Sequence, residues 1–175
     1  TQEQVQAILT SQIDIGFVRP ISPDRELESQ VIFREPFRAV LPETHPLATC
    51  DHLSLATLAQ EPFILIPRRL APGLYDQIVA VCQHADFSPT IVQEANQWTT
   101  IIGLVSAGLG VSLLPASVEE ISRRGVVYKP LIDVPHQVDL SIVWRKEEVS
   151  PIVRNFLSVV TATQGNFSNL VTEKQ

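Results

Sequence analysis

The sequence predicts an α/β fold built as two lobes, with mostly parallel sheets flanked by helices. Short apolar runs of strand length alternate along the chain with amphipathic helical patterns, which is typical of βαβ units. Breaks near residues 20–36 and 133–139 indicate that the chain crosses from a first lobe to a second and then returns. A length of 175 residues allows one domain or two small lobes.

The first lobe opens with a helix and a strand. Thr1–Gln4 fits a capping box, and apolar residues follow it at helical spacing. Residues 13–18 read as a strand, which Arg19 and Pro20 end. A helix followed by a strand is the second half of a βαβ unit. Because the first strand is missing and the chain has no methionine, we expect that it begins partway through a larger protein.

The later elements follow from the same two periodicities. We expect strands at 27–33, 36–41, 62–67, 90–95, 111–114, 126–131 and 138–144. We expect helices at 53–59, 73–85, 98–109 and 116–123, and a last helix that begins at the Ser150–Pro151 pair. The first lobe then comprises residues 1–35 and 139–163, the second comprises 36–138, and 164–175 form a mobile tail.

Composition excludes several classes of protein. With 45% apolar and 18% charged residues the chain is globular, and its net charge of -6 makes it a poor binder of nucleic acid by itself. No apolar run is long enough to span a membrane, and no signal segment opens the chain. Two cysteines without a CxxC motif and four histidines without metal-ligand spacing predict neither a metal site nor a cofactor.

Motifs of enzymes are also missing. The sequence has no GxSxG, HExxH or GxxxxGK[ST] motif. The segment that begins Ser106-Ala-Gly-Leu-Gly follows a helix and precedes a strand, the reverse of a dinucleotide-binding loop, so a glycine turn is the better interpretation. We therefore expect a binding protein rather than an enzyme.

Several residues at the ends of elements suit the binding of an anion. Thr1 begins a helix, and Asn96 precedes another, where free backbone N–H groups attract a carboxylate. Arg19 follows a strand, although a salt bridge with Glu35 is an equal alternative. The adjacent Arg68 and Arg69 also follow a strand, and Arg68 enters the candidate site, although adjacent loop charges are more often solvated.

Four segments together resemble one known family, the effector-binding domains of LysR-type transcriptional regulators. They are the opening helix and strand that end in Ile13-Asp-Ile-Gly-Phe-Val-Arg19, Leu41-Pro-Glu-Thr-His-Pro-Leu-Ala48, Gly103-Leu-Val-Ser-Ala-Gly-Leu-Gly-Val-Ser-Leu-Leu-Pro115, and Ile142-Val-Trp-Arg-Lys with the closing helix. Each segment alone is a weak signal. Their order and spacing over about residues 1–160 make the resemblance specific.

The resemblance implies a periplasmic-binding-protein-like fold (type 2) with an interlobe cleft for a small organic anion, such as an aromatic acid or a ring-cleavage product. In that cleft Thr1 would hydrogen-bond the carboxylate, Arg19 would supply charge, and Pro72, Gly73, Leu74 and Leu140 would form the turn and the apolar walls. Leu74 replaces an aromatic residue of some relatives, which weakens the case for ring stacking.

The resemblance also implies partners. It indicates a cytoplasmic homo-oligomer, a dimer or tetramer, which contacts DNA only through an N-terminal winged helix-turn-helix that this chain lacks, and which also contacts RNA polymerase. A periplasmic solute-binding protein of a transporter remains the alternative. The sequence upstream distinguishes the two, because a signal peptide favours transport and a winged helix-turn-helix favours regulation.

Overall fold

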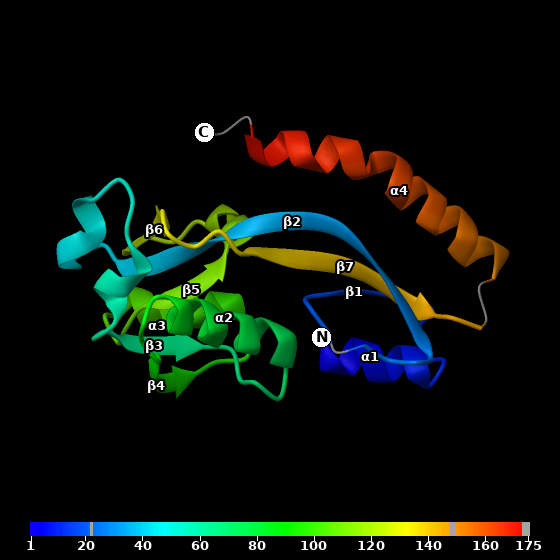
Figure 1. The fold of residues 1–175 in the computed structure, drawn as a ribbon, viewed down its shortest axis with the longest axis horizontal. Helices are drawn as coiled ribbons and strands as arrows, with labels where there is room; N and C mark the ends of the chain where they lie inside the picture. Colours follow the sequence, from blue (N-terminus) through cyan, green and yellow to red (C-terminus); the bar gives the residue numbers. More distant parts are fainter. Residues whose placement is uncertain (22, 148–149, 173–175) are drawn as a thin grey trace. The chain divides into compact units, whose positions relative to one another are not determined.

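The computed structural model describes residues 1–175 apart from 22, 148–149 and 173–175, and it contains two compact units. The first unit comprises Thr1–Arg34 and Asp139–Gln175, and the second comprises Glu35–Val138. Two strands, β2 (Leu27–Pro42) and β7 (Gln137–Arg145), contain the two boundaries. The chain therefore leaves the first unit along β2 and returns to it along β7 (Figure 1).

In the first unit, helix α1 (Gln2–Leu9) packs against strand β1 (Ile15–Val18), which pairs antiparallel with β7. The packing is close at Gly16, where a Cβ atom would lie 2.9 Å from Oε1 of Gln4. This oxygen accepts a hydrogen bond from the backbone N–H of Phe17 at 2.9 Å. Thr1 is the N-cap residue of α1, but its side chain makes no capping hydrogen bond, so the predicted capping box is wrong.

Helix α4 (Pro151–Thr172) begins where the sequence predicts. The hydroxyl of Ser150 accepts a hydrogen bond from the N–H of Val153 at 3.2 Å, as an N-cap does. The helix continues to Thr172, so it includes most of the 164–175 segment that was expected to be a tail. The end of that segment, 173–175, lies outside the described residues.

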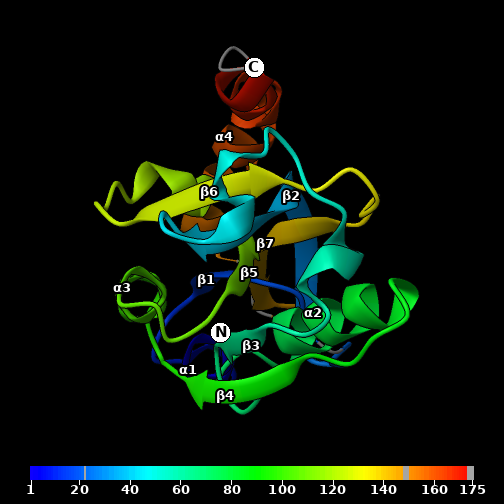
Figure 2. The ribbon, with the colours of Figure 1, turned by 90° about the vertical axis from the view of Figure 1, so that its left-hand side faces the viewer.

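The second unit contains a small parallel sheet with a helix on each face. Strands β3 (Pro62–Leu65) and β4 (Thr90–Glu94) pair in parallel, and helices α2 (Pro72–His84) and α3 (Trp98–Ser106) lie on opposite sides of β3 (Figure 2). Alternate residues of β3 explain this arrangement. Phe63 and Leu65 share one buried cluster with the apolar face of α2, whereas Ile64 shares the other with that of α3.

The larger sheet departs from the expected parallel pairing, although the α/β class is right and two isolated bridges, Leu53–Leu131 and Phe63–Val111, are parallel. β2 pairs antiparallel with β5 (Ser112–Pro115) and with β6 (Val126–Pro130). The two strands predicted at 27–33 and 36–41 are the single strand β2. Pro36 precedes the first residue of β2 that pairs with β5, Phe37, so its missing N–H breaks none of those pairs.

Two predicted short helices are 3-10 turns, at Leu55–Leu58 and Ala116–Glu120, and a third 3-10 turn lies at Pro46–Thr49. The turn at Leu55–Leu58 is held by Asp133. Its carboxylate accepts hydrogen bonds from the N–H of Leu55 at 2.9 Å and from the hydroxyl of Ser54 at 2.6 Å. Among the described helices, none combines the length and the apolar character that a bilayer span requires.

Candidate functional site

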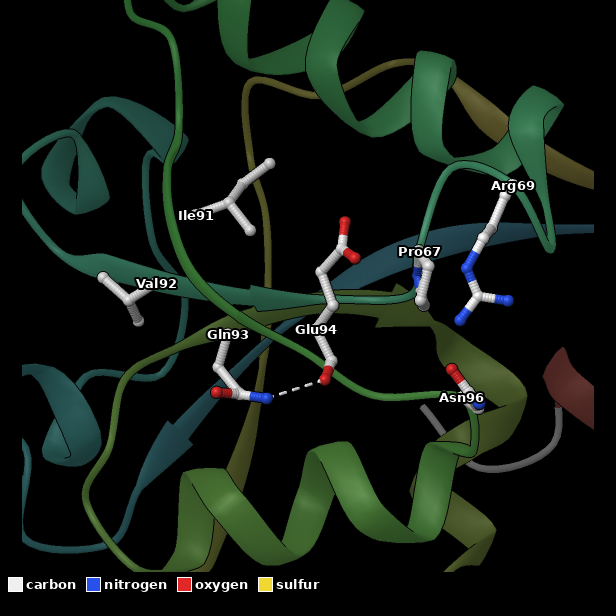
Figure 3. A pocket seen from close by; sticks show the side chains of 7 residues that line it. All are labelled: Pro67, Arg69, Ile91, Val92, Gln93, Glu94 and Asn96. Carbon is white, nitrogen blue, oxygen red and sulfur yellow. Dashed lines mark hydrogen bonds between the residues drawn. The ribbon is translucent and has the colours of Figure 1, made fainter.

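The candidate site lies at the carboxyl ends of β3 and β4. Because these strands are parallel, the segments that follow them meet at one edge of the sheet. A pocket of about 470 Å³ opens there, which we call the strand-end pocket (Figure 3). It is lined by Pro67, Arg69, Ile91, Val92, Gln93, Glu94 and Asn96.

Two adjacent arginines follow β3, and the structure gives them different roles. Arg68 donates two hydrogen bonds to the carboxylate of Asp76 in α2, with distances of 2.7 and 2.9 Å. These bonds hold the pKa of Asp76 below its usual range and raise that of Arg68. Arg69 lines the strand-end pocket and has no hydrogen-bond or ion-pair partner among the described residues. Arg69 is therefore the cation available to a ligand.

The loop after β4 brings an amide to the same pocket. Figure 3 shows that Asn96 and the guanidinium of Arg69 point into the same space. Asn96 lies two residues before helix α3, whose N-cap residue Gln97 makes no side-chain capping bond. Backbone N–H groups in the first turn of such a helix attract negative charge. The predicted role of Asn96 at an anion site is compatible with this geometry.

The pocket also holds one acid. Glu94 ends β4 and lines the pocket, and its backbone carbonyl accepts a hydrogen bond from the side-chain amide of Gln93 at 2.9 Å (Figure 3). A carboxylate in the same pocket as a guanidinium disfavours ligands with several negative charges and can accept a hydrogen bond from the ligand. The arrangement suits a small monoanion with a second polar group.

The turn that opens α2 contains three of the predicted site residues, and they differ in burial. Pro72 and Gly73 are half-buried, but the side chain of Leu74 has no exposed surface. Leu74 packs in the same cluster as Phe63 and Ile78. Its spacing within α2 places it on the core face of the helix, so the structure assigns it to the hydrophobic core.

The other three predicted residues, Thr1, Arg19 and Leu140, belong to the first unit and are half-buried there. Arg19 directly follows β1, as expected. Glu35, its suggested alternative partner, is almost fully buried in the second unit. Its carboxylate accepts hydrogen bonds from the backbone N–H and the hydroxyl of Ser117.

The thiol of Cys82 lies in the hydrophobic core. Burial raises the pKa of the Cys82 thiol to about 12, so the group is neutral and enclosed in the core. Within the described ranges, no group of three or more histidine, cysteine or acidic side chains is placed to hold a metal ion.

Comparison with known proteins identifies similar chains. The family described as LysR substrate binding domain matches residues 1–165. The HTH-type transcriptional regulator CatR of Pseudomonas putida is 40% identical over 160 residues, which are 91% of this chain and 55% of CatR. The chain spans about half the length of the curated relatives it matches.

Two solved structures share the fold. The BenM effector binding domain with its effector benzoate has a TM-score of 0.82 and 25% identity, covering 96% of this chain and 77% of that one. Full-length CbnR complexed with its target DNA has a TM-score of 0.83 and 26% identity, covering 93% of this chain and 57% of that one.

Proposed function

Because the chain belongs to the LysR substrate-binding domain family, we propose that it is the effector-sensing part of a transcriptional regulator and that it binds a small organic anion. The observation that carries this proposal is that Arg69 and Asn96 both line the strand-end pocket. The guanidinium supplies charge, and the amide supplies a directional hydrogen bond. The similarity to a domain whose effector is benzoate supports an aromatic acid as the first candidate.

The mechanism we propose is differential binding. An effector shifts the conformational equilibrium of the regulator only by the difference in its affinity for the two states. We propose that the first and second units are the two lobes of the fold. We propose further that the ordered anion site on the second unit exists mainly in the state that the effector favours.

The remaining roles come from family membership. We propose that the whole regulator works in the cytoplasm as a dimer or tetramer, binds DNA through an N-terminal winged helix-turn-helix, and contacts RNA polymerase. The similarity to CbnR, solved on its target DNA, supports the DNA-binding role. We propose a binding role rather than catalysis, since the relatives are transcriptional regulators. The same relatives do not favour a solute-binding protein of a transporter.

The test is a thermal-shift screen of benzoate, hydroxylated benzoates and small aliphatic acids, followed by calorimetric titration of the best ligand. A ligand at about 100 times its Kd raises the free energy of unfolding by about 2.7 kcal/mol, which such a screen detects. We expect Arg69→Ala to weaken binding by about 1.5–3 kcal/mol, the value of a hydrogen bond to a charged group. This corresponds to a roughly 10- to 150-fold higher Kd.

Arg68→Ala is the matched control, because it removes the same charge from the adjacent residue, which is already paired with Asp76. We expect it to change the Kd less than Arg69→Ala. Equal losses in both variants would contradict the assignment of Arg69 to the site. The family resemblance assigns Thr1, Arg19 and Leu140 to effector binding too, and Arg19→Ala in the same titration tests that assignment.

A further inference from the structure

We propose that His84 and His136 form a binding site for a divalent transition-metal ion such as Zn²⁺ or Ni²⁺. His84 is the last residue of α2, and His136 lies in the loop before β7. Both belong to the second unit, and both side chains are exposed. The site is separate from the strand-end pocket, because neither histidine lines it.

A hydrogen bond prepares His84 to act as a ligand. Its Nδ1 lies 2.7 Å from the backbone carbonyl oxygen of Ala80. Since a carbonyl can only accept, Nδ1 carries the proton, and the lone pair of the neutral ring is at Nε2. A backbone carbonyl that holds the second nitrogen is the usual support of a histidine ligand in metal sites.

The distance between the rings suits one shared ion. The ring centroids of His84 and His136 are 5.1 Å apart, and the ring planes are inclined by 51°. Two imidazoles bound to one zinc ion at the tetrahedral angle have centroids about 5.2 Å apart, because the Zn–N distance is about 2.0–2.1 Å. The observed separation of the centroids therefore matches that of two histidines that share one ion.

The local field also favours a cation. His84 lies in the last turn of α2, where the dipole of the helix gives a partial negative charge. Imidazole nitrogen is a ligand that zinc, nickel and copper accept, whereas calcium and magnesium prefer oxygen. Because the described residues place no third protein ligand there, water completes the coordination.

The chain offers matched controls in its other two histidines. The ring of His45 is engaged on both sides, since Nδ1 accepts a hydrogen bond from the N–H of Leu47 at 3.1 Å and Nε2 lies 3.3 Å from Glu61. His52 is exposed, like the proposed ligands, but no contact with a second histidine is found for it among the described residues. His52→Ala therefore removes one surface imidazole without touching the pair.

The experiment is calorimetric titration of the protein, free of any affinity tag, with Zn²⁺ and with Ni²⁺. We expect one ion per chain. His84→Ala and His136→Ala should each lower the affinity by roughly tenfold or more, since loss of even an outer-shell partner costs about that much. His52→Ala should leave the affinity unchanged. Thermal unfolding without metal should be the same for all variants, because the replaced side chains are exposed.

A second measurement locates the ion. Paramagnetic Ni²⁺ should broaden the backbone NMR signals around His84 and His136 before any others. The proposal is overturned if neither ion binds, if His84→Ala or His136→Ala keeps the original affinity, or if His52→Ala loses as much. Broadening centred on His45 or His52 would overturn it too.

Discussion

The adjacent arginines Arg68 and Arg69 have different surroundings at the edge of the parallel sheet. Arg68 is held by Asp76, and this link raises the pKa of the arginine and lowers that of the acid. Arg69 is left to line the pocket. The sequence predicts that an arginine lies at this edge, because both follow an apolar strand. It does not show which one is available, since that depends on a partner eight positions along the chain.

Two glycines in the turn after α3 should differ in the cost of replacement by alanine. Gly108 has a φ of +77° with open space around its Cα, whereas a Cβ on Gly110 would lie 2.3 Å from the carbonyl oxygen of Pro62. That oxygen accepts the N–H of Val111, so it is held in place. We expect Gly108→Ala to destabilise by about 1–2 kcal/mol, the cost of left-handed backbone. Gly110→Ala should cost more, roughly 3 kcal/mol.

Denaturant unfolding of both variants checks this order. Gly108→Asn is the control for backbone strain, because asparagine tolerates positive φ better than alanine, and it should recover part of the loss at Gly108. Equal stabilities of Gly108→Ala and Gly110→Ala would contradict the close approach of the backbone at Gly110.

At the scale of elements, Asp133 stabilises the 3-10 turn at Leu55–Leu58 from a distant part of the chain. Desolvation opposes the charge of Asp133, but the hydrogen bonds from Ser54 and from the N–H of Leu55 prevail and lower its pKa. We expect Asp133→Ala to reduce the free energy of unfolding by about 1–2 kcal/mol at pH 7, as for a lost helix cap. The exposed Asp51→Ala is the matched control, with little expected effect.

The stabilisation that Asp133 provides should depend on pH, because its pKa is lowered in the folded protein. An acid whose folded pKa is lowered stabilises fully above its unfolded pKa, about 3.9 for aspartate, and loses this stabilisation as the pH falls through the folded value. The difference between the original protein and Asp133→Ala should therefore be constant from pH 5 to 7 and should shrink below about pH 4. Denaturant unfolding at several pH values measures it, and a difference that grows on acidification would contradict the lowered pKa.

Most elements could be predicted from apolar periodicity, but their directions in the sheets could not. The ranges of α2 and β4 agree with the sequence to within about a residue at each end, because both have clear repeats and turn residues at their ends. Alternation of strands and helices indicates parallel pairing, which holds for β3 and β4. β2 and β7 connect the two units without a helical crossover. The alternation of strands and helices therefore does not reveal that these two strands pair antiparallel with β5 and β1.

At the scale of the whole molecule, charge limits what the chain does alone. It has 19 acidic against 13 basic residues, and affinity for DNA comes largely from basic groups that neutralise phosphates. We expect the chain by itself to give no sequence-specific retention of operator DNA in a gel shift at physiological salt. A specific complex under these conditions would show that DNA binding does not need the winged helix-turn-helix proposed upstream.

The sequence can place a candidate site residue only where its position depends on a single helix or strand. The sequence places Asn96 and the two arginines after strands, which is where the strand-end pocket lies, whereas the burial of Leu74 depends on its packing against other elements and is not visible in a turn motif. The pairing of His84 and His136 joins residues far apart in the chain, so no spacing rule detects it.

The most direct test of the central claim is an NMR titration of the protein with the acid that binds best in the thermal-shift screen. The strand-end pocket predicts that the largest backbone shift changes occur at Arg69, at Asn96 and in the first turn of α3, and that Arg69→Ala suppresses them. Changes confined to the first unit, or changes at Arg69 and Asn96 that persist in Arg69→Ala, would contradict the account.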